Sequence, residues 1–506
     1  MRHVQGINRA LIALFVLTAS LLLAAQRPAQ AAGIPDRPES LKYPELKFNI
    51  PKADQYRFKL KNGIVAYVAE DHSLPLVTVS VIVKAGSFLE PADRTGLASL
   101  TGTMMRKGGA GSLTAEEFDE KADFLAADVS SFIGDTQAGA SVNCLASALD
   151  KSLDLFFEMM RAPRFQQSRL DVEKSDLIED MKQRNDDAGT ILNREWGWQM
   201  YGRTHFSSRQ ATKAMIESLT RDSLVDFHKA YWRPENMIIS VAGDVNTKEI
   251  LANLERRFAD WKVQGPVVPW PPPAPDYAPK PGLFYVEKDI PQGKVYIGNR
   301  STKWNRWDDP DNYALLVMND ILGGGGFTSR ITKKVRSDEG LAYSAGSRYN
   351  IGTYYPLDYR ISFQSKSSTV ALAGKLSLVE VAKLKDDNVS EDELKTSKAS
   401  FIDTFPRNFE SPARVVSLFA TDDYIGRPHS YWDNYRANIQ KVTPDEVKRV
   451  AKKYLADKDN VVFLVVGKRS EIEKGDPDGR ASMKEFFGGK ATQLPLLDPL
   501  TLQPMK

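Results

Sequence analysis

Histidine and cysteine are scarce in this chain of 506 residues, and their scarcity removes several kinds of site. The single cysteine, Cys144, has no partner for an internal disulfide. It lies in the alternating stretch 140–145, and no paired histidine or activating context is visible, which favours a buried structural thiol over a nucleophile. No two histidines stand four residues apart, the spacing at which one helix face presents two imidazoles to a metal. The histidines are His3, His72, His205, His228 and His429.

The chain also lacks a strong excess of charge of either sign. It has 68 Lys and Arg against 65 Asp and Glu. Residues 1–31 contain Arg2, Arg9 and Arg27 and no acidic residue, so beyond them the basic and acidic residues balance. This balance gives no indication of nucleic acid or an anionic membrane surface as a partner.

The first 31 residues are typical of a secretory signal peptide. An apolar run from Ala10 to Ala25 follows two basic residues, and Ala29-Gln30-Ala31 has the small-residue pattern of a cleavage site. The run is short for a membrane span, so an uncleaved anchor is the less favoured alternative. No cysteine follows the run to carry a lipid. We therefore predict a periplasmic or secreted protein with no membrane attachment after cleavage.

Two distant segments of the chain, 219–243 and 442–467, repeat one pattern. In each, a helix with a threonine N-cap, Thr220 or Thr443, is followed by a buried strand. A spacing of about 220 residues is too long for a solenoid repeat and indicates a duplicated domain. The length of the chain is sufficient for two such domains.

A proline-rich segment, 266–282, separates the two copies. It is too dense in proline for a helix or a central strand, and we interpret it as a stiff linker rather than a ligand for a proline-binding module. The predicted domains are therefore 34–265 and 283–485. The tail, 486–506, has no periodicity and is predicted to be disordered or docked on a partner.

The N-terminal half contains a helix in an informative setting. A strand with one buried face is predicted for 76–83, a break for 85–87, and a helix for 96–107, whose sequence is GLASLTGTMMRK. This order, with GLA opening the helix, resembles the N-terminal domain of the pitrilysin/insulinase (inverzincin) metallopeptidase family.

In active members of that family this helix carries H-x-x-E-H, in which both histidines bind zinc and the glutamate is the general base. The same frame places Ser99, Gly102 and Thr103 at those positions, and none of them can perform either task. The family's third ligand is a glutamate on a later helix, where register places Asp180. Alone, Asp180 is interpreted as a solvated helix acid. The resemblance thus implies a degenerate zinc motif and no metal or other cofactor in this chain.

The C-terminal half contains GGGGFTSR at 323–330 and KVRSDEGLAYS at 334–344. These strings resemble the family's second signature, in which an arginine and a tyrosine seven residues later project toward the catalytic cleft. Here the two are Arg336 and Tyr343, and the resemblance makes them the predicted catalytic residues. Their donors can hold peptide carbonyls and stabilise an oxyanion. The alternative is an arginine closing a helix and a tyrosine on a buried strand, as in many ordinary domains.

The resemblance also implies the fold. Family members of this size are α+β proteins with two homologous domains, each a mixed, mainly antiparallel sheet packed with helices, that face each other across a chamber. In active members an edge strand aligns the substrate by β-augmentation. In this sequence that strand holds Val129, Ser130, Ser131, Phe132 and Ile133.

In some two-chain members, one subunit bears H-x-x-E-H and the other the arginine and tyrosine. This sequence matches the second kind. The leading hypothesis is a zinc-free subunit of a heteromeric metallopeptidase that cuts unstructured peptides, inactive alone and paired with a paralogous H-x-x-E-H subunit that holds the zinc. One alternative is a pseudoprotease that binds or scaffolds other proteins in the cell envelope without catalysis. Another is an independent protease with an unusual metal site, for which the required histidine spacing is missing.

Overall fold

The computed structural model describes Leu41 and residues 48–261, 265–273, 277–300 and 306–505. The predicted signal peptide lies outside the described residues. Residues Ile50–Lys506 form one compact unit, which contains the second predicted half and the first predicted half from Ile50 onward. In the described residues no helix is both long and apolar enough to cross a membrane.

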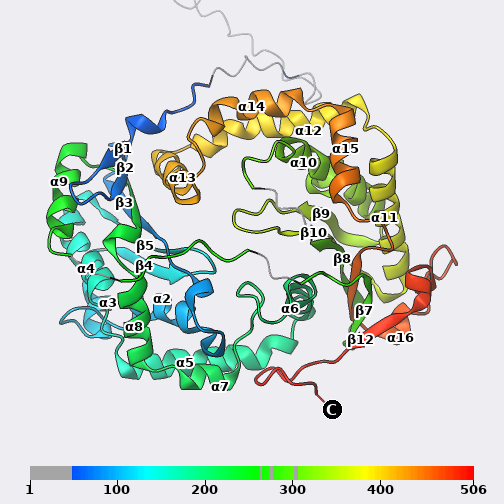
Figure 1. Ribbon diagram of the computed structural model, residues 1–506, viewed down its shortest axis with the longest axis horizontal. Helices are drawn as coiled ribbons and strands as arrows, with labels where there is room; N and C mark the ends of the chain where they lie inside the picture. Colours follow the sequence, from blue (N-terminus) through cyan, green and yellow to red (C-terminus); the bar gives the residue numbers. More distant parts are fainter. Residues whose placement is uncertain (1–40, 42–47, 262–264, 274–276, 301–305, 506) are drawn as a thin grey trace, which may run out of the picture. The chain divides into compact units, whose positions relative to one another are not determined.

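The first sheet has six strands in the order β1-β2-β6-β3-β5-β4 (Figure 1). Only the pairing of β2 with β6 is parallel. Apolar side chains fill β6 and one face of β3, because β-branched residues suit a pleated, buried surface. The strands are β1 (Arg57–Lys59), β2 (Val65–Glu70), β3 (Leu76–Val83), β4 (Asp128–Ile133), β5 (Ala138–Leu145) and β6 (Met237–Gly243).

The second sheet has the order β12-β7-β11-β8-β10-β9. Its strands are β7 (Gly282–Glu287), β8 (Gln292–Arg300), β9 (Ala342–Tyr349), β10 (Asp358–Lys366), β11 (Val462–Gly467) and β12 (Ala491–Leu494). Without β1 and β12, the two sheets have the same strand order, and the parallel pair β7 and β11 corresponds to β2 and β6. The predicted α+β duplication is therefore confirmed. The chamber between the halves stays a prediction.

Helices of the first half are α2 (Leu97–Lys107), α3 (Ala115–Phe124), α4 (Leu149–Arg161), α5 (Gln167–Lys182), α6 (Ala188–Tyr201), α7 (Lys213–Ser218), α8 (Arg221–Tyr231) and α9 (Thr247–Phe258). Those of the second are α10 (Asn312–Asn319), α11 (Val370–Asp386), α12 (Glu391–Thr404), α13 (Pro412–Ile425), α14 (Tyr431–Lys441), α15 (Pro444–Tyr454) and α16 (Arg469–Ile472). The predicted caps of the repeat are present. Thr220 begins α8 and Thr443 begins α15, each accepting a hydrogen bond from a backbone N–H in the first turn.

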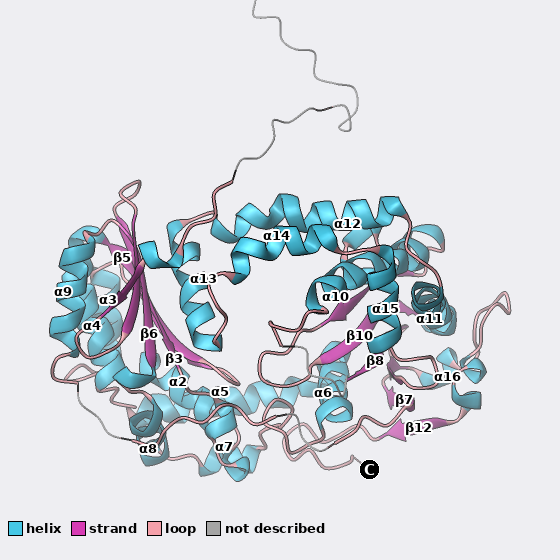
Figure 2. Ribbon diagram, turned by 45° about the horizontal axis from the view of Figure 1, so that its top comes forward, coloured by secondary structure: helices cyan, strands magenta, loops and turns pink. Residues whose placement is uncertain are grey.

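Each half covers the other's sheet with one helix. Helix α6, from the first half, packs on β8 and β11, and α13, from the second half, packs on β2, β3 and β6 (Figures 1 and 2). Both crossings carry hydrogen bonds, of which the first is buried and the second partly buried. The Trp196 indole donates to the Asp358 carboxylate at 2.8 Å, and the Tyr67 hydroxyl donates to the Asp423 carboxylate at 2.9 Å. The halves are thus interlocked by packing as well as by the linker.

The C-terminal tail is ordered over its described residues, which the sequence did not lead us to expect. Strand β12 extends the second sheet, and the chain then reaches the first half. There the Asn185 side chain donates to the Leu497 carbonyl at 2.7 Å, and the backbone N–H of Lys213 donates to the Leu500 carbonyl at 2.9 Å. Leu497 is buried. The tail therefore docks within its own chain and ties the two halves together.

Candidate functional site

The positions predicted to form a degenerate zinc motif lie on α2. Ser99 is exposed, Thr103 is half-buried, and Gly102 is buried. Asp180 is exposed near the end of α5. A serine, a glycine and a threonine supply neither imidazole nor carboxylate, so these side chains do not fit a zinc ion. In the described part of the chain, no three His, Cys, Asp or Glu side chains are grouped so that they could hold a metal.

Gly102 instead allows α2 to pack closely against β4, the strand predicted to bind substrate. A β-carbon on Gly102 would lie 2.4 Å from the backbone nitrogen of Ile133. The Ser131 hydroxyl donates to the Gly102 carbonyl at 2.7 Å, and the Arg106 guanidinium donates to the Val129 carbonyl at 2.8 Å. The strand is thus fastened directly to the helix, and Gly102, the position predicted to correspond to the family's general base, has no room for a side chain.

Strand β4 is the last strand of its sheet, as predicted, and pairs with β5 alone. Val129 and Ile133 face the core, whereas Ser130 and Phe132 are exposed and Ser131 is half-buried. Phe132 keeps 51% of its surface in contact with solvent. An open strand edge beside an exposed aromatic ring is compatible with an added peptide strand.

The glycine-rich segment in the second half has an unusual backbone. Residues Asp320–Gly324 and Thr332–Asp338 are π-helical, and they are the only π-helical turns in the described residues. Gly323 lies against β9, where a β-carbon would come within 2.3 Å of the Ser347 nitrogen. Gly326 has φ +64°, in the left-handed region. Because π-helical turns are rare and concentrate at functional sites, this segment is a candidate site on backbone grounds alone.

Arg336 and Tyr343, predicted from the sequence to act together, are in contact. The guanidinium carbon of Arg336 lies 5.0 Å from the centre of the Tyr343 ring and 4.4 Å from that of Phe327. Tyr343 is 87% exposed and Phe327 66% exposed. We call these three residues the Arg336 cluster. The tyrosine does not lie on a buried strand position, which removes the structural alternative considered for it.

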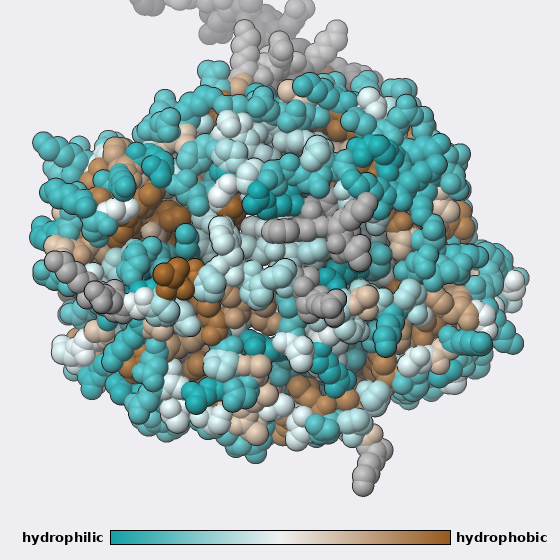
Figure 3. All heavy atoms as spheres, in the orientation of Figure 1, coloured by the Kyte–Doolittle hydropathy of each residue, from teal (hydrophilic) through white to brown (hydrophobic). Residues whose placement is uncertain are grey.

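The Arg336 guanidinium has no acceptor within the described residues, and its nitrogens are not buried. Two large aromatic side chains are exposed beside it, on a molecule whose visible face in Figure 3 is mostly hydrophilic. Exposed aromatic groups around an unpaired donor are typical of a binding site.

The segment that carries the cluster is firmly braced. Arg330 donates to both carboxylate oxygens of Glu393, at 2.6 and 2.9 Å. Partial burial works to raise the pKa of Glu393, but hydrogen bonds from Arg330 and from the Ser390 cap outweigh it and lower that pKa to about 2. The Thr332 hydroxyl also donates to the Ala345 carbonyl of β9 at 2.7 Å. The cluster is exposed, but its backbone is held by buried or charge-assisted bonds.

The sequence did not identify Phe327 as a member of this site. It follows directly after four glycines, in a short 3-10 turn at Gly326–Thr328. A bulky ring in an otherwise small and polar loop was the available signal. Its contact with Arg336 depends on the π-helical path of the intervening chain, which the side-chain pattern does not encode.

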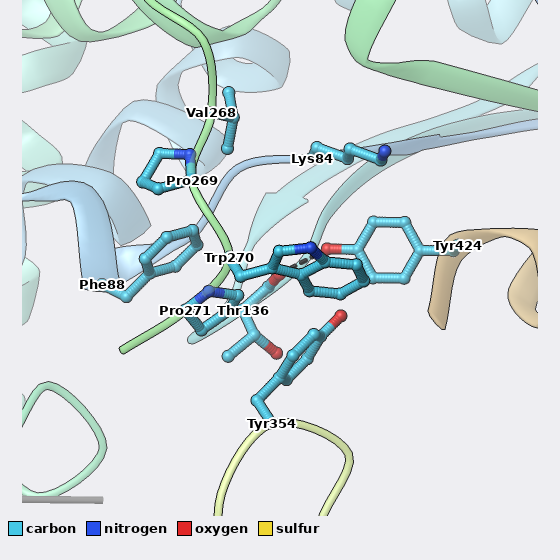
Figure 4. A pocket seen from close by; sticks show the side chains of 9 residues that line it. All are labelled: Lys84, Phe88, Thr136, Val268, Pro269, Trp270, Pro271, Tyr354 and Tyr424. Atoms are coloured by element: carbon cyan, nitrogen blue, oxygen red, sulfur yellow. Dashed lines mark hydrogen bonds between the residues drawn. The ribbon is translucent and has the colours of Figure 1, made fainter. Parts of the chain in front are cut away.

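A second concave region lies where the proline-rich linker meets both halves (Figure 4). This pocket is small, with a cavity volume of about 90 Å³. Trp270 of the linker packs on Tyr354 with ring centres 5.5 Å apart, and the Tyr424 hydroxyl donates to the Thr136 carbonyl. The pocket is lined by Lys84, Phe88, Thr136, Val268, Pro269, Trp270, Pro271, Tyr354 and Tyr424. These contacts connect the β4–β5 turn to α13, so the pocket lies at the interface between the two halves.

Comparison with known families gives two matches along the chain. A model described as "Insulinase (Peptidase family M16)" matches residues 65–208, which include α2 and β4. A model described as "Peptidase M16 inactive domain" matches residues 218–401, which include the Arg336 cluster.

Individual relatives are distant. The chain is 22% identical to an uncharacterized zinc protease of Bacillus subtilis, over 79% of this chain and 96% of the relative. It is 23% identical to a "non-peptidase homolog" of Helicobacter pylori, over 79% of this chain and 91% of the relative.

Two solved structures share the fold. An M16 inactive-domain structure from Pseudomonas fluorescens has a TM-score of 0.72 and 23% identity, covering 81% of this chain and 98% of that one. The periplasmic protease PqqL of Escherichia coli has a TM-score of 0.69 and 15% identity, covering 82% of this chain and 45% of that one.

Proposed function

The chain belongs to the M16 peptidase (insulinase) family, and from that premise we propose that it is the zinc-free subunit of a heteromeric peptidase that degrades unstructured peptides. Arg336 and Tyr343 bind and orient the peptide backbone and donate hydrogen bonds to the developing oxyanion. A paralogous subunit with H-x-x-E-H supplies the metal and the general base. In this division of labour the present chain is inactive alone.

One observation carries the proposal: a half-buried Arg336 lies against the exposed Tyr343, with no acceptor for the guanidinium in the described residues, in a chain whose Gly102 leaves no space for a base. A scaffold needs no such donors, whereas a peptidase subunit does. The names of the relatives include both zinc proteases and a non-peptidase homolog, and both kinds of role are therefore represented among them.

The peptide would lie along β4 and reach the Arg336 cluster in the assembled enzyme. Edge-strand pairing supplies affinity through backbone hydrogen bonds and tolerates varied sequences, which suits a peptidase of unstructured peptides. We further propose that the protein is exported to the periplasm or secreted. The sequence of residues 1–31 supports this, and one structural relative, PqqL, is a periplasmic protease.

Reconstitution tests the proposal. The purified chain is mixed with an H-x-x-E-H paralogue from the same genome, and hydrolysis of a quenched fluorescent peptide is followed. We expect activity only in the mixture. Arg336→Ala or Tyr343→Phe should reduce kcat/KM about a hundredfold, the usual effect of losing an oxyanion donor. Arg348→Ala, an exposed arginine on the same strand as Tyr343, is the matched control and should leave the rate unchanged.

Two results would reject the proposal. Full turnover by the mixture with both donor variants would show that the pair has no catalytic role. Undiminished binding to the paralogue without any hydrolysis would instead support the scaffold function.

A further inference from the structure

The Arg336 cluster offers more than a donor to a carbonyl, and this inference deepens the proposed function on which it rests. Arg330, in the same segment, shows how another guanidinium finds its hydrogen-bond acceptors there. Arg330 meets both oxygens of Glu393 in a bidentate pair. Arg336, six residues later, lies over two exposed rings and has no carboxylate partner within the described residues.

The surrounding charge favours an anion. Lys333, Lys334 and Arg336 lie in one π-helical segment whose single carboxylate is that of the exposed Asp338, so the segment has an excess of positive charge. The nearby carboxylate of Glu339 is already engaged, at 3.1 Å by Lys334 and at 3.0 Å by Arg480. A peptide carbonyl offers Arg336 a single neutral oxygen. A carboxylate offers two charged oxygens that match the spacing of the guanidinium donors.

The aromatic rings make this arginine selective. Contacts with the faces of Phe327 and Tyr343 hold the guanidinium by cation–π attraction, and that attraction leaves its in-plane N–H donors available. Holding the long side chain in one orientation lowers the entropy lost when a ligand binds. A bidentate ligand benefits most, because both of its bonds depend on the plane of the guanidinium.

We propose that the Arg336 cluster is a carboxylate-binding site that recognises an acidic group of the bound peptide, either its free C-terminal carboxylate or an aspartate or glutamate side chain. Arg336 forms the bidentate pair with two of its five N–H donors, which leaves the others for the peptide carbonyl oxygen. Phe327 is a positioning residue that fixes the plane of the guanidinium. Tyr343 contributes both a ring face and a hydroxyl donor.

Fluorescence anisotropy with the full chain tests this with short labelled peptides of one sequence. One peptide has a free C-terminal acid, a second has a C-terminal amide, and a third has the amide and an internal Gln→Glu change. We expect the acid or the glutamate peptide to bind at least about tenfold more tightly than the uncharged peptide, the gain of one charge-assisted pair. Whichever of the two is preferred identifies the source of the carboxylate.

The variants separate the roles of the residues. Arg336→Ala should abolish the preference for the charged peptide, and Arg336→Lys should weaken it, since an ammonium lacks the planar fork. Phe327→Leu should weaken it, whereas Phe327→Tyr should retain it because the ring face is kept. Arg348→Ala should bind all peptides as the wild type does. Because Phe327 and Tyr343 are mostly exposed, these variants are expected to fold, which their thermal unfolding verifies.

The failures of the two proposals are distinguishable. Equal binding of acid and amide peptides, with both weakened by Arg336→Ala, would overturn carboxylate recognition and leave backbone binding in place. Equal binding that is unaffected by Arg336→Ala would overturn both. An absence of saturable binding for every peptide up to about 1 mM would also overturn carboxylate recognition, since a single such site should reach that range.

Discussion

Gly102 lies so close to Ile133 that a β-carbon on the glycine would come within 2.4 Å of the isoleucine's backbone nitrogen. Helix α2 and strand β4 are therefore in backbone contact at the position that the family resemblance predicts for a general base. The second half repeats this relationship with Gly323 and Ser347, at 2.3 Å. In both halves a glycine lets a helix hold the edge strand of its sheet.

This contact predicts that Gly102→Ala destabilises the protein. Alanine is normally better than glycine inside a helix by about 1 kcal/mol, but overpacking against a backbone costs about 1–3 kcal/mol. We expect a net loss in urea unfolding. Gly197→Ala in α6 is the matched control, since its β-carbon would meet only Ser208 at an ordinary 3.5 Å. A Gly102→Ala protein as stable as the control would show that β4 moves freely away from α2.

Restoring the motif should not restore a metal site. The triple variant Ser99→His, Gly102→Glu, Thr103→His supplies the ligand types, but the glutamate forces β4 away from α2. The position predicted for the third ligand holds Asp180, whose side chain is one carbon shorter than glutamate. We expect less than one zinc per chain by elemental analysis and a lower melting temperature. Stoichiometric zinc with a raised melting temperature would contradict the steric argument.

The Arg330–Glu393 pair predicts an acid-sensitive segment next to the Arg336 cluster. The folded pKa of Glu393, about 2, lies below its ordinary value of 4.5, so folding favours the ionised form. The stabilisation is fully present above about pH 4.5 and is lost as pH falls toward 2. Glu393→Gln should therefore be less stable than the wild type at pH 6, and the difference should shrink between pH 4.5 and 2. A difference independent of pH would indicate a packing effect alone.

Local features of the fold were predictable because each depends on a few neighbouring residues. The Thr443 cap and Glu446 form the expected capping box of α15 because both partners lie within one helical turn. The alternation of residues in 76–83 predicted β3 for the same reason. The seven-residue separation of Arg336 and Tyr343 matched a known signature, and the structure brings the two into contact.

Features that depend on distant segments were not predictable. To predict that α6 and α13 are exchanged between the halves, one must know which sheet the apolar face of each helix contacts. The hydrophobic periodicity of a helix does not identify that sheet. The same holds for Leu497, which is buried and whose carbonyl accepts a hydrogen bond from Asn185, 312 residues earlier. Phe327 was missed because a π-helical turn between it and Arg336 sets their contact.

Two buried histidines predict a second pH dependence. Burial lowers the pKa of His228 and of His205 to about 4, below the ordinary 6.5. The folded state therefore does not bind the protons that the unfolded chain binds. The contribution of these histidines to the free energy of unfolding is fully present above pH 6.5 and is lost as pH falls from 6.5 to 4. Each histidine contributes a slope of up to about 1.4 kcal/mol per pH unit. His228→Gln should roughly halve this slope in urea unfolding, while an unchanged slope would assign it to other groups.

The docked tail predicts that the two halves loosen when it is removed. Strand β12 lies on the second sheet, while Leu497, Pro499 and Leu500 receive hydrogen bonds from the first half. Deletion of residues 495–506 leaves β12 in place but exposes Arg184 and Asn185, which lie just before the exchanged helix α6. We expect faster amide hydrogen exchange in α6 and α7 and a lower melting temperature.

Asn185→Ala, which removes the 2.7 Å bond to Leu497 and the 3.3 Å bond that the Asn185 side chain accepts from Arg194, should give a smaller change in the same direction. Lys490→Ala, an exposed change just before β12, is the control and should leave exchange unaltered. Because α6 and α13 already interlock the halves, the truncated chain should remain folded, and the effect should be confined to opening motions. Faster exchange spread evenly over both sheets would instead show that the tail stabilises the whole fold, and unchanged exchange in α6 would show that the tail does not restrain the halves.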